Sequence, residues 1–183
     1  RPLLGARRSS VFPVPSRGAV YAECGPMNGL DAIIAAQKRA SVIAQATSDP
    51  RRKITIQAFM LFSKIQEVDV YLRENLAEAE RIIESHPEFA FCVLNGGRPM
   101  ALPKKIKGKV NPAGMGERRD LLARCGLPAP FLVGTPPKGA ATDDFLDACA
   151  MLLIADRRAA GLARPHPEPM RRDSCGLPVA IWA

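Results

Sequence analysis

The residues best suited to chemistry are acidic side chains in two distant segments. Glu84 and Glu88 flank His86 in the stretch ESHPE, and Asp144 and Asp147 lie three residues apart in DDFLDA. Hard divalent cations take oxygen ligands, and two-metal cleavage of a phosphodiester needs several carboxylates from different elements. One interpretation is therefore a metal site built from Glu84, Asp144 and Asp147, with His86 and Glu88 as further catalytic candidates.

Asp147 carries the most information among these acids. Asp143 and Asp144 are explained by the favourable position of acidic residues in the first turn of a helix. Asp147, in contrast, is followed by ACAMLLIA, and burying an unpaired carboxylate there costs several kcal/mol. It needs a partner, which is either an arginine or a backbone group, or a divalent cation shared with other carboxylates.

His86 is one of two histidines in the chain, and it lies between two glutamates. Because histidine titrates near neutral pH, His86 is a candidate metal ligand, general base or orienting group. The structural alternative is a histidine that caps a helix or is satisfied within the core. The residue types alone leave both interpretations open.

Basic residues suggest an anionic partner. The formal net charge is +8, which favours polyanions such as nucleic acids. Phosphate-contact candidates are Arg7 and Arg8 near the start, Lys64, and the pair Lys104 and Lys105. Lys64 can instead pair with Glu67, three residues further along the chain. The segment with Lys104 and Lys105 can instead be a solvated loop without a phosphate partner.

The elements that must position these residues are mostly helical. With 183 residues the chain is long enough for one core, so a single domain over residues 1–183 is expected. Apolar spacing predicts helices over residues 28–47, 54–75, 116–126 and 142–161, and short strands over 81–85 and 177–183. Residues 87–97 fit either a strand or a short helix that begins at Pro87.

Several classes of protein are excluded by what the sequence lacks. It contains neither a phosphate-binding loop motif nor a dinucleotide fingerprint, and no G-x-S-x-G stretch. Five scattered cysteines form no C-x-x-C pair, which indicates reduced thiols in a cytoplasmic protein. No apolar run approaches the roughly 20 residues of a membrane span.

The chain carries an ordered series of motifs that includes LLGARRSSVFPVP, QAFMLFSKIQEVD, ESHPEFAFCVLNGGRPM, ERRDLL, DDFLDA and GLPVAIWA. This series resembles the family called domain of unknown function 429, whose members are regarded as predicted nucleases with an RNase H-like fold. The resemblance implies an α/β fold with a mixed sheet flanked by helices. It also implies Mg²⁺ or Mn²⁺ bound by acidic residues, with Glu84, His86 and Glu88 matching one motif and Asp144 and Asp147 the other.

The start of the chain departs from the family pattern. Family members usually begin with a strand that carries an aspartate, followed by a second aspartate-bearing segment, and neither is present here. We therefore expect an RNase H-like domain without its N-terminal strands. The leading hypothesis is a nuclease in which carboxylate-bound Mg²⁺ activates water; the alternatives are a non-catalytic module that binds nucleic acid or another anion, and a hydrolase of a small phosphorylated substrate.

Overall fold

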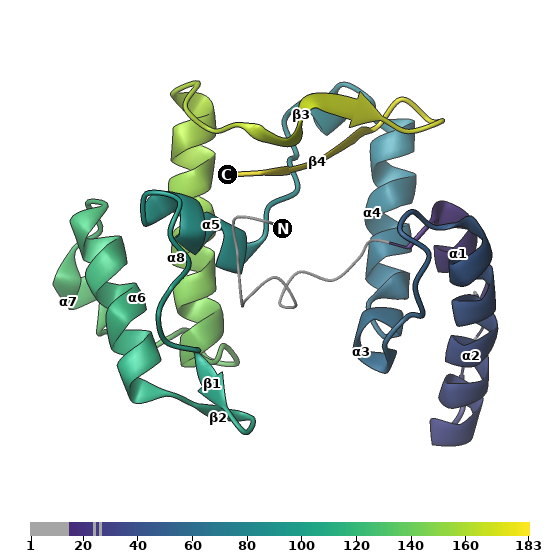
Figure 1. The fold of residues 1–183 in the computed structure, drawn as a ribbon, viewed down its shortest axis with the longest axis horizontal. Helices are drawn as coiled ribbons and strands as arrows, with labels where there is room; N and C mark the ends of the chain where they lie inside the picture. Colours follow the sequence, from purple (N-terminus) through teal and green to yellow (C-terminus); the bar gives the residue numbers. More distant parts are fainter. Residues whose placement is uncertain (1–14, 24, 26) are drawn as a thin grey trace. The chain divides into compact units, whose positions relative to one another are not determined.

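The computed structural model describes residues 15–23, 25 and 27–183. The chain divides into two compact units. The described part of the first, here called the N-terminal unit, lies within residues 12–81, and that of the second, the C-terminal unit, is residues 82–183. Figure 1 shows the elements of both units. The candidates Arg7 and Arg8 lie outside the described residues.

The N-terminal unit is helical in its described part. Its elements are α1 (Arg17–Val20), α2 (Leu30–Thr47), α3 (Ile56–Phe59), α4 (Phe62–Glu74) and the 3-10 helix η2 (Glu78–Glu80). The helix expected over residues 28–47 is confirmed by α2. The one expected over 54–75 is divided into α3 and α4 by a turn at Met60 and Leu61. Phe59 and Phe62, on either side of this turn, are both buried, and their ring centroids are 5.2 Å apart.

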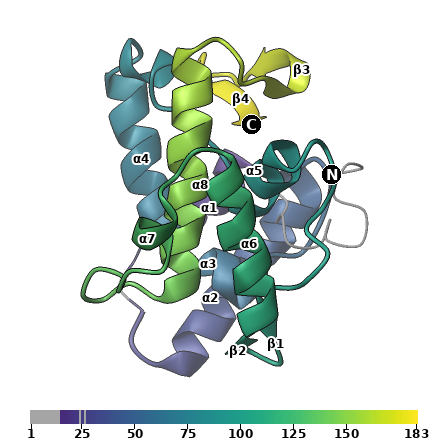
Figure 2. The same cartoon turned by 90° about the vertical axis from the view of Figure 1, so that its left-hand side faces the viewer.

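The C-terminal unit contains the remaining elements. They are α5 (Pro87–Leu94), β1 (Lys105–Ile106), β2 (Lys109–Val110), α6 (Pro112–Arg124), α7 (Ala129–Leu132), α8 (Thr142–Ala159), β3 (Pro165–Arg172) and β4 (Pro178–Trp182). One core joins α5, α6 and α8 through buried residues such as Phe91, Leu122 and Leu146. Figures 1 and 2 show α6 running alongside α8.

The segment after the ESHPE motif is a helix, which resolves the ambiguity of residues 87–97. Helix α5 begins at Pro87, where a missing backbone donor costs nothing, and His86 is its N-cap residue. It ends at Leu94 and is followed by Gly96 and Gly97, which both have positive φ angles. The N–H of Gly97 donates to the carbonyl of Cys92 at 2.9 Å, as in a glycine-terminated helix.

The strands of the described residues form two small antiparallel sheets, so the chain belongs to the α/β class in the broad sense. In the C-terminal sheet, β3 pairs with β4, which confirms the strand expected over residues 177–183. The strand expected over 81–85 is reduced to a single parallel bridge between Glu84 and Ile181. The N–H of Trp182 donates to the carbonyl of Glu84 at 2.8 Å.

The lysine segment expected to be a loop forms a β-hairpin. Lys105 pairs with Val110 and Ile106 with Lys109. The two turn residues, Lys107 and Gly108, have φ angles of 49° and 78°, the signs that a tight two-residue hairpin turn requires. Helix α6 follows directly and therefore starts at Pro112, earlier than the predicted residue 116.

Helix α8 carries the predicted acidic motif in its first two turns. It begins at Thr142, and Ala141 is its N-cap residue. Asp143 and Asp144 lie in the first turn, as expected. Among the described residues, none of the helices is long and apolar enough to cross a membrane.

Candidate functional site

Two lysines from the base of the hairpin meet two aspartates of α8. Lys104 Nζ lies 2.5 Å from Asp147 Oδ2 and 3.8 Å from Asp143 Oδ2. Lys105 Nζ lies 2.7 Å from the same oxygen of Asp143. Because Asp143 and Asp147 are four residues apart, their side chains occupy one face of the helix. We call Asp143 and Asp147 the α8 aspartate pair.

Burial differs between the members of this cluster. The side chain of Asp143 is 2% exposed and that of Asp147 16%, against 32% for Lys104 and 44% for Lys105. Asp143 Oδ1 is buried and has no hydrogen-bond partner among the described residues. A buried carboxylate oxygen without a partner is unusual in a folded protein, so this oxygen marks a position with unused capacity for a ligand.

The lysines and the burial move the two carboxyl pKa values in opposite directions. Burial by itself raises the pKa of Asp143, but the hydrogen bond from Lys105 and the charges of both lysines outweigh it and bring that pKa below its usual value. Burial raises the pKa of Asp147, and the neighbouring Asp143 charge adds to the rise, while Lys104 only partly opposes it. The hydrogen bond with Asp143 raises the pKa of Lys105.

The backbone that delivers Lys104 is held against α6. The Glu117 carboxylate accepts hydrogen bonds from the N–H groups of Ala101 at 2.7 Å and Leu102 at 2.9 Å. Asn111 donates from its side chain to the Pro103 carbonyl and from its backbone to the Lys104 carbonyl, both at 2.8 Å. These contacts fix the backbone of residues 101–104, and the Lys104 side chain extends from it to α8.

A glycine makes this close approach to α6 feasible. A Cβ atom on Gly114 would lie 2.1 Å from the carbonyl oxygen of Pro103, which is far inside van der Waals contact. Only glycine at position 114 lets the segment that carries Lys104 pack this closely against the helix.

Glu88 from the ESHPE motif has a structural partner. Arg118, with no exposed surface, donates from Nη2 to Glu88 Oε1 at 3.2 Å and to Oε2 at 3.0 Å. Its Nη1 donates to the carbonyls of Leu102 and Gly114, each at 3.0 Å. Glu88 thus balances the charge of a buried guanidinium that itself holds the segment leading to Lys104.

Glu84 lies beside strand β4. Its backbone pairs with β4, and the ring of the neighbouring Trp182 stacks against Arg158, with 4.3 Å from Cζ to the ring centroid. Arg158 follows Asp147 by eleven residues, which corresponds to about 16 Å along the helix axis. The structure thus does not bring Glu84 to the α8 aspartate pair.

Two acidic-motif candidates remain. Asp144 is exposed on α8, and its charge contributes to the raised pKa of Lys105, while His86 is a half-buried N-cap residue of α5. Within the described ranges there is no group of three or more His, Cys, Asp or Glu side chains that could hold a metal ion. The predicted trio of Glu84, Asp144 and Asp147 is therefore not assembled, and the structure instead joins Asp147 to Asp143.

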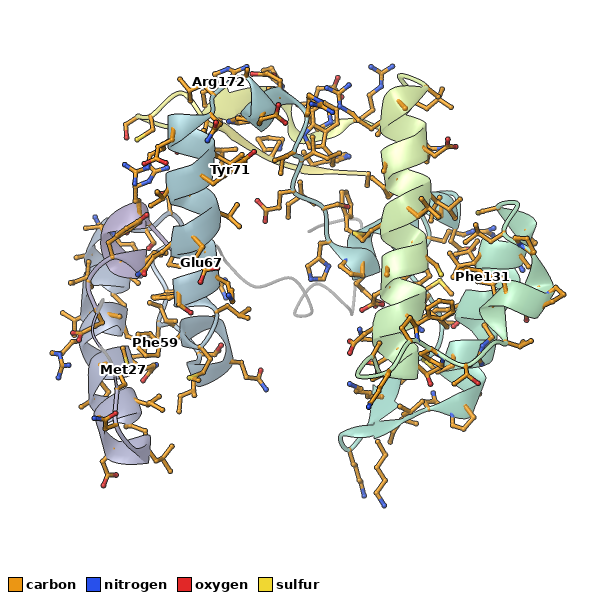
Figure 3. All side chains as sticks on the ribbon, turned by 180° about the vertical axis from the view of Figure 1, so that it is seen from behind. Met27, Phe59, Glu67, Tyr71, Phe131 and Arg172 are labelled. Carbon is orange, nitrogen blue, oxygen red and sulfur yellow. The ribbon has the colours of Figure 1, made fainter. Side chains whose placement is uncertain are left out.

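In the N-terminal unit, the candidate Lys64 is already paired. Its ammonium lies 2.9 Å from Glu67 Oε2 in an exposed contact one turn along α4, so the alternative partner on the helix is the one observed. Figure 3 labels Glu67 and Tyr71, which lie on this helix.

Asp69 of α4 contacts three side chains of its own unit. It accepts from Arg17 Nη2 at 2.8 Å and from the Tyr21 hydroxyl at 2.8 Å, and Arg73 Nε lies at 3.1 Å. Although burial by itself raises the pKa of Asp69, these partners bring it below its usual value. No spacing pattern in the sequence predicts that Arg17, 52 residues away, is a partner of Asp69.

Asp143 and Arg118 are the functional candidates that the sequence reasoning missed. Asp143 had a sufficient explanation in the helix dipole, but its four-residue spacing from Asp147 is a signal that places both on one face. Arg118 belongs to the run ERRD, which reads as a solvated helix face. Nothing in that run distinguishes the buried arginine from its exposed neighbours.

Comparison with known proteins returns one family. The family model described as "Protein of unknown function (DUF429)" matches residues 1–172 of this chain. Neither the curated proteins nor the solved structures contain a match.

Proposed function

We propose that this chain, which belongs to the DUF429 family, is a metal-dependent phosphodiesterase that acts on nucleic acid. We propose further that its fold is RNase H-like and that it works in the cytoplasm. The parallel pairing of Glu84 with Ile181 beside the antiparallel β3–β4 pair supports a mixed sheet. Within the described part of the chain, Cys125, Cys149 and Cys175 form no disulfide, which suits a reducing compartment.

One observation carries the proposal: a single ammonium group lies between two carboxylates, one of them almost fully buried. Lys104 Nζ is within 3.8 Å of both Asp143 and Asp147, as a bridging cation would be. Asp143 Oδ1 adds an unused buried ligand atom. Mg²⁺ in proteins is often held by one or two carboxylates and completes its octahedron with water and substrate phosphate. The α8 aspartate pair therefore fits a hydrated Mg²⁺ or Mn²⁺ ion.

The chemistry supplied by the bound cation is activation of water and neutralisation of charge on the phosphodiester. Asp143 and Asp147 would hold it. Lys104 and Lys105, released from the carboxylates, would then be available to bind a substrate phosphate at the same place, because their backbone stays clamped to α6 by Glu117 and Asn111. Lysine is a common phosphate-binding residue.

Titration of the full chain with Mg²⁺ and Mn²⁺ in a calorimeter tests the metal site. Asp143→Asn and Asp147→Asn should each abolish or strongly weaken binding. Asp156→Asn, an exposed position near the other end of α8, is the matched control and should bind as the unchanged protein does. Asp144→Asn decides between the two assignments: loss of binding in Asp144→Asn and Asp147→Asn, but not in Asp143→Asn, would support the original trio and not the α8 aspartate pair.

Cleavage assays test the activity itself. Single- and double-stranded DNA and RNA, together with small phosphodiesters, are incubated with the protein and Mn²⁺, and the products are identified. Cleavage that disappears in Asp147→Asn supports the proposal. Hydrolysis limited to the small substrates would replace nucleic acid with a small phosphorylated molecule, and no turnover of any substrate would overturn the proposed activity.

A second candidate function is a non-catalytic module that binds nucleic acid or another anion. Its specific support is that the α8 aspartate pair is already neutralised by two lysines, so the cluster needs no metal for charge balance. Binding of nucleic acid that persists in EDTA and in Asp147→Asn, without any cleavage, would favour this second candidate.

A further inference from the structure

A run of three basic residues connects α2 and α3 in the N-terminal unit. Arg51, Arg52 and Lys53 are consecutive and all exposed. We call them the basic loop. In the part of the chain that the structure describes, none of the three forms an ion pair. The only acidic residue between Ser48 and Ile54 is Asp49. The segment thus presents concentrated positive charge to solvent.

The other basic side chains of this unit are largely neutralised. Five of them form ion pairs with acidic side chains of the same unit, namely Arg17, Arg39, Lys64, Arg73 and Arg81. Lys38 is the remaining described basic residue outside the basic loop without such a pair. The basic residues of the described N-terminal unit that lack an ion pair are therefore concentrated mainly in one short segment, and they are not spread over its surface.

Both ends of this segment are fixed to the body of the unit. On one side, Ser48 is buried, its N–H donates to Ala44 at 2.9 Å, and its hydroxyl accepts from the N–H of Ser16 at 2.8 Å. On the other side, Ile54 is 6% exposed in the core. Its N–H donates to the Ser41 hydroxyl at 3.1 Å, and its carbonyl accepts from the Gln37 amide.

Anchoring of both ends matters for binding. A flexible basic tail loses conformational freedom when it meets a partner, and that loss subtracts from affinity. The basic loop spans only the residues between two buried anchors, so much of the ordering has already occurred on folding. Its charged side chains project from a pre-organised backbone.

From these observations we propose that the basic loop binds the phosphate backbone of a nucleic acid. Two adjacent guanidinium groups can each bind phosphate oxygens in a bidentate manner, and Lys53 adds a third cation. The inference rests on the nucleic-acid partner in the proposed function, but not on metal binding or cleavage. It places a binding surface in the N-terminal unit, separate in sequence from the α8 aspartate pair.

A nucleic acid fits this surface better than a membrane does. Protein segments that bind the membrane interface combine basic residues with aromatic or large apolar side chains that enter the lipid. Residues 48–55 contain no aromatic residue, and their one large apolar side chain, Ile54, is buried in the core; the next apolar residue, Ile56, is partly exposed and is a single aliphatic side chain with no aromatic residue beside the basic loop. Charge without an inserting group is typical of contacts to the nucleic-acid backbone.

The test measures binding of the full chain to a short DNA duplex and to a short RNA in EDTA, at several salt concentrations between about 50 and 200 mM. EDTA separates binding from any metal-dependent cleavage. Each phosphate contact contributes about 0.9 to the slope of log K against log salt for duplex DNA. Arg51→Ala/Arg52→Ala should therefore lower the magnitude of the slope by nearly two and weaken binding to all sequences alike.

The matched control is Arg39→Ala/Arg81→Ala. It removes the same number of arginines from the same unit and lowers the formal charge of +8 by the same two units, but both residues are ion-paired. It should keep most of the salt slope. Arg51→Lys/Arg52→Lys should keep most of the salt slope of the unchanged protein, because both positive charges are retained. Circular dichroism checks that every variant is folded.

Three outcomes would overturn the inference. The first is an unchanged slope in Arg51→Ala/Arg52→Ala, and the second is an equal loss in the control variant. The third is binding of the unchanged protein to vesicles of phosphatidylserine and phosphatidylcholine but to neither nucleic acid. If the unchanged protein cleaves no substrate but still binds nucleic acid in EDTA through the basic loop, the result would count against the proposed activity and leave the basic loop supported.

Discussion

Glu88 and Arg118 form a buried ion pair that joins the ESHPE motif to the segment carrying Lys104. The guanidinium donates to both carboxylate oxygens of Glu88, at 3.2 and 3.0 Å, and to the Leu102 carbonyl at 3.0 Å. Its carbon also lies 5.2 Å from the centre of the Phe91 ring. The motif residue that sequence reasoning assigned to chemistry thus contributes to the arrangement of the α8 site from a distance.

Removal of Glu88 should therefore destabilise the protein strongly. Glu88→Ala leaves the Arg118 charge buried without its counter-ion, which typically costs about 3–5 kcal/mol of unfolding free energy. Denaturant unfolding followed by circular dichroism measures the change. The comparison variant Asp156→Ala, at an exposed position of α8, should change stability by about 0.5 kcal/mol or less. A loss in Glu88→Ala as small as that of Asp156→Ala would show that the ion pair is dispensable.

Two glycines of α6 should respond oppositely to the same substitution. Gly114→Ala forces a methyl group against the Pro103 carbonyl, 2.1 Å away in the unrelaxed structure, so it should lower the melting temperature. Gly116→Ala meets nothing within 4 Å and should raise stability by about 0.5–1 kcal/mol, because alanine is the better helix former. Thermal unfolding of both variants measures the difference. A neutral Gly114→Ala would contradict the close approach of residues 101–104 to α6.

Acidification should weaken the N-terminal unit through Asp69. Its folded-state pKa is lowered by Arg17, Tyr21 and Arg73, in opposition to burial. The unfolded chain binds the proton more tightly, at a pKa of about 3.9. The stabilisation is therefore fully present above that value, and it is lost as the pH falls from there through the lowered folded pKa.

Unfolding free energy measured against pH checks this contribution. Asp69→Asn should be less stable than the unchanged protein at neutral pH, and the difference should shrink on acidification. Asp31→Asn, at an exposed position in the first turn of α2, serves as the control. A difference between Asp69→Asn and the unchanged protein that stays constant down to pH 2 would contradict the ionic role of Asp69.

Lys104 should compete with a divalent cation for the α8 aspartate pair. Its ammonium lies 2.5 Å from Asp147 and 3.8 Å from Asp143. Removal of a unit charge at such distances changes the local energy by one to several kcal/mol, so Lys104→Ala should bind Mn²⁺ at least about tenfold more tightly. Calorimetric titration measures the affinity. Lys109→Ala, from the same hairpin but exposed, should leave it unchanged; weaker Mn²⁺ binding in Lys104→Ala would reverse the assigned role.

Much of the local structure was predictable because it depends on short-range patterns. Helix α2 follows from apolar spacing, and the end of α6 from Gly126, whose φ of 103° suits glycine. The strand β4 and the first-turn acids of α8 also appear where the sequence predicts them. The broad α/β class follows from these elements.

Other local features were missed for identifiable reasons. The turn at Met60 and Leu61 contains neither Gly nor Pro, so continuous apolar spacing concealed the break between α3 and α4. The hairpin of Lys105–Ile106 and Lys109–Val110 is too short to show alternation in sequence. Its turn could have been suspected from Lys107–Gly108, since glycine is common where φ is positive.

The sequence by itself determined which residues are charged, how they are spaced along each element, and that the chain carries the motifs of its family. It predicted that Asp147 needs a partner, because a carboxylate beside an apolar stretch must be compensated. Only the tertiary structure decided that the partner is Lys104 and not an arginine, that Asp143 completes the pair, and that Glu88 belongs to Arg118. The reason is physical: an ion pair requires a few ångströms between charged atoms, and residues as far apart as 104 and 147 reach that distance only when the helices and the hairpin pack.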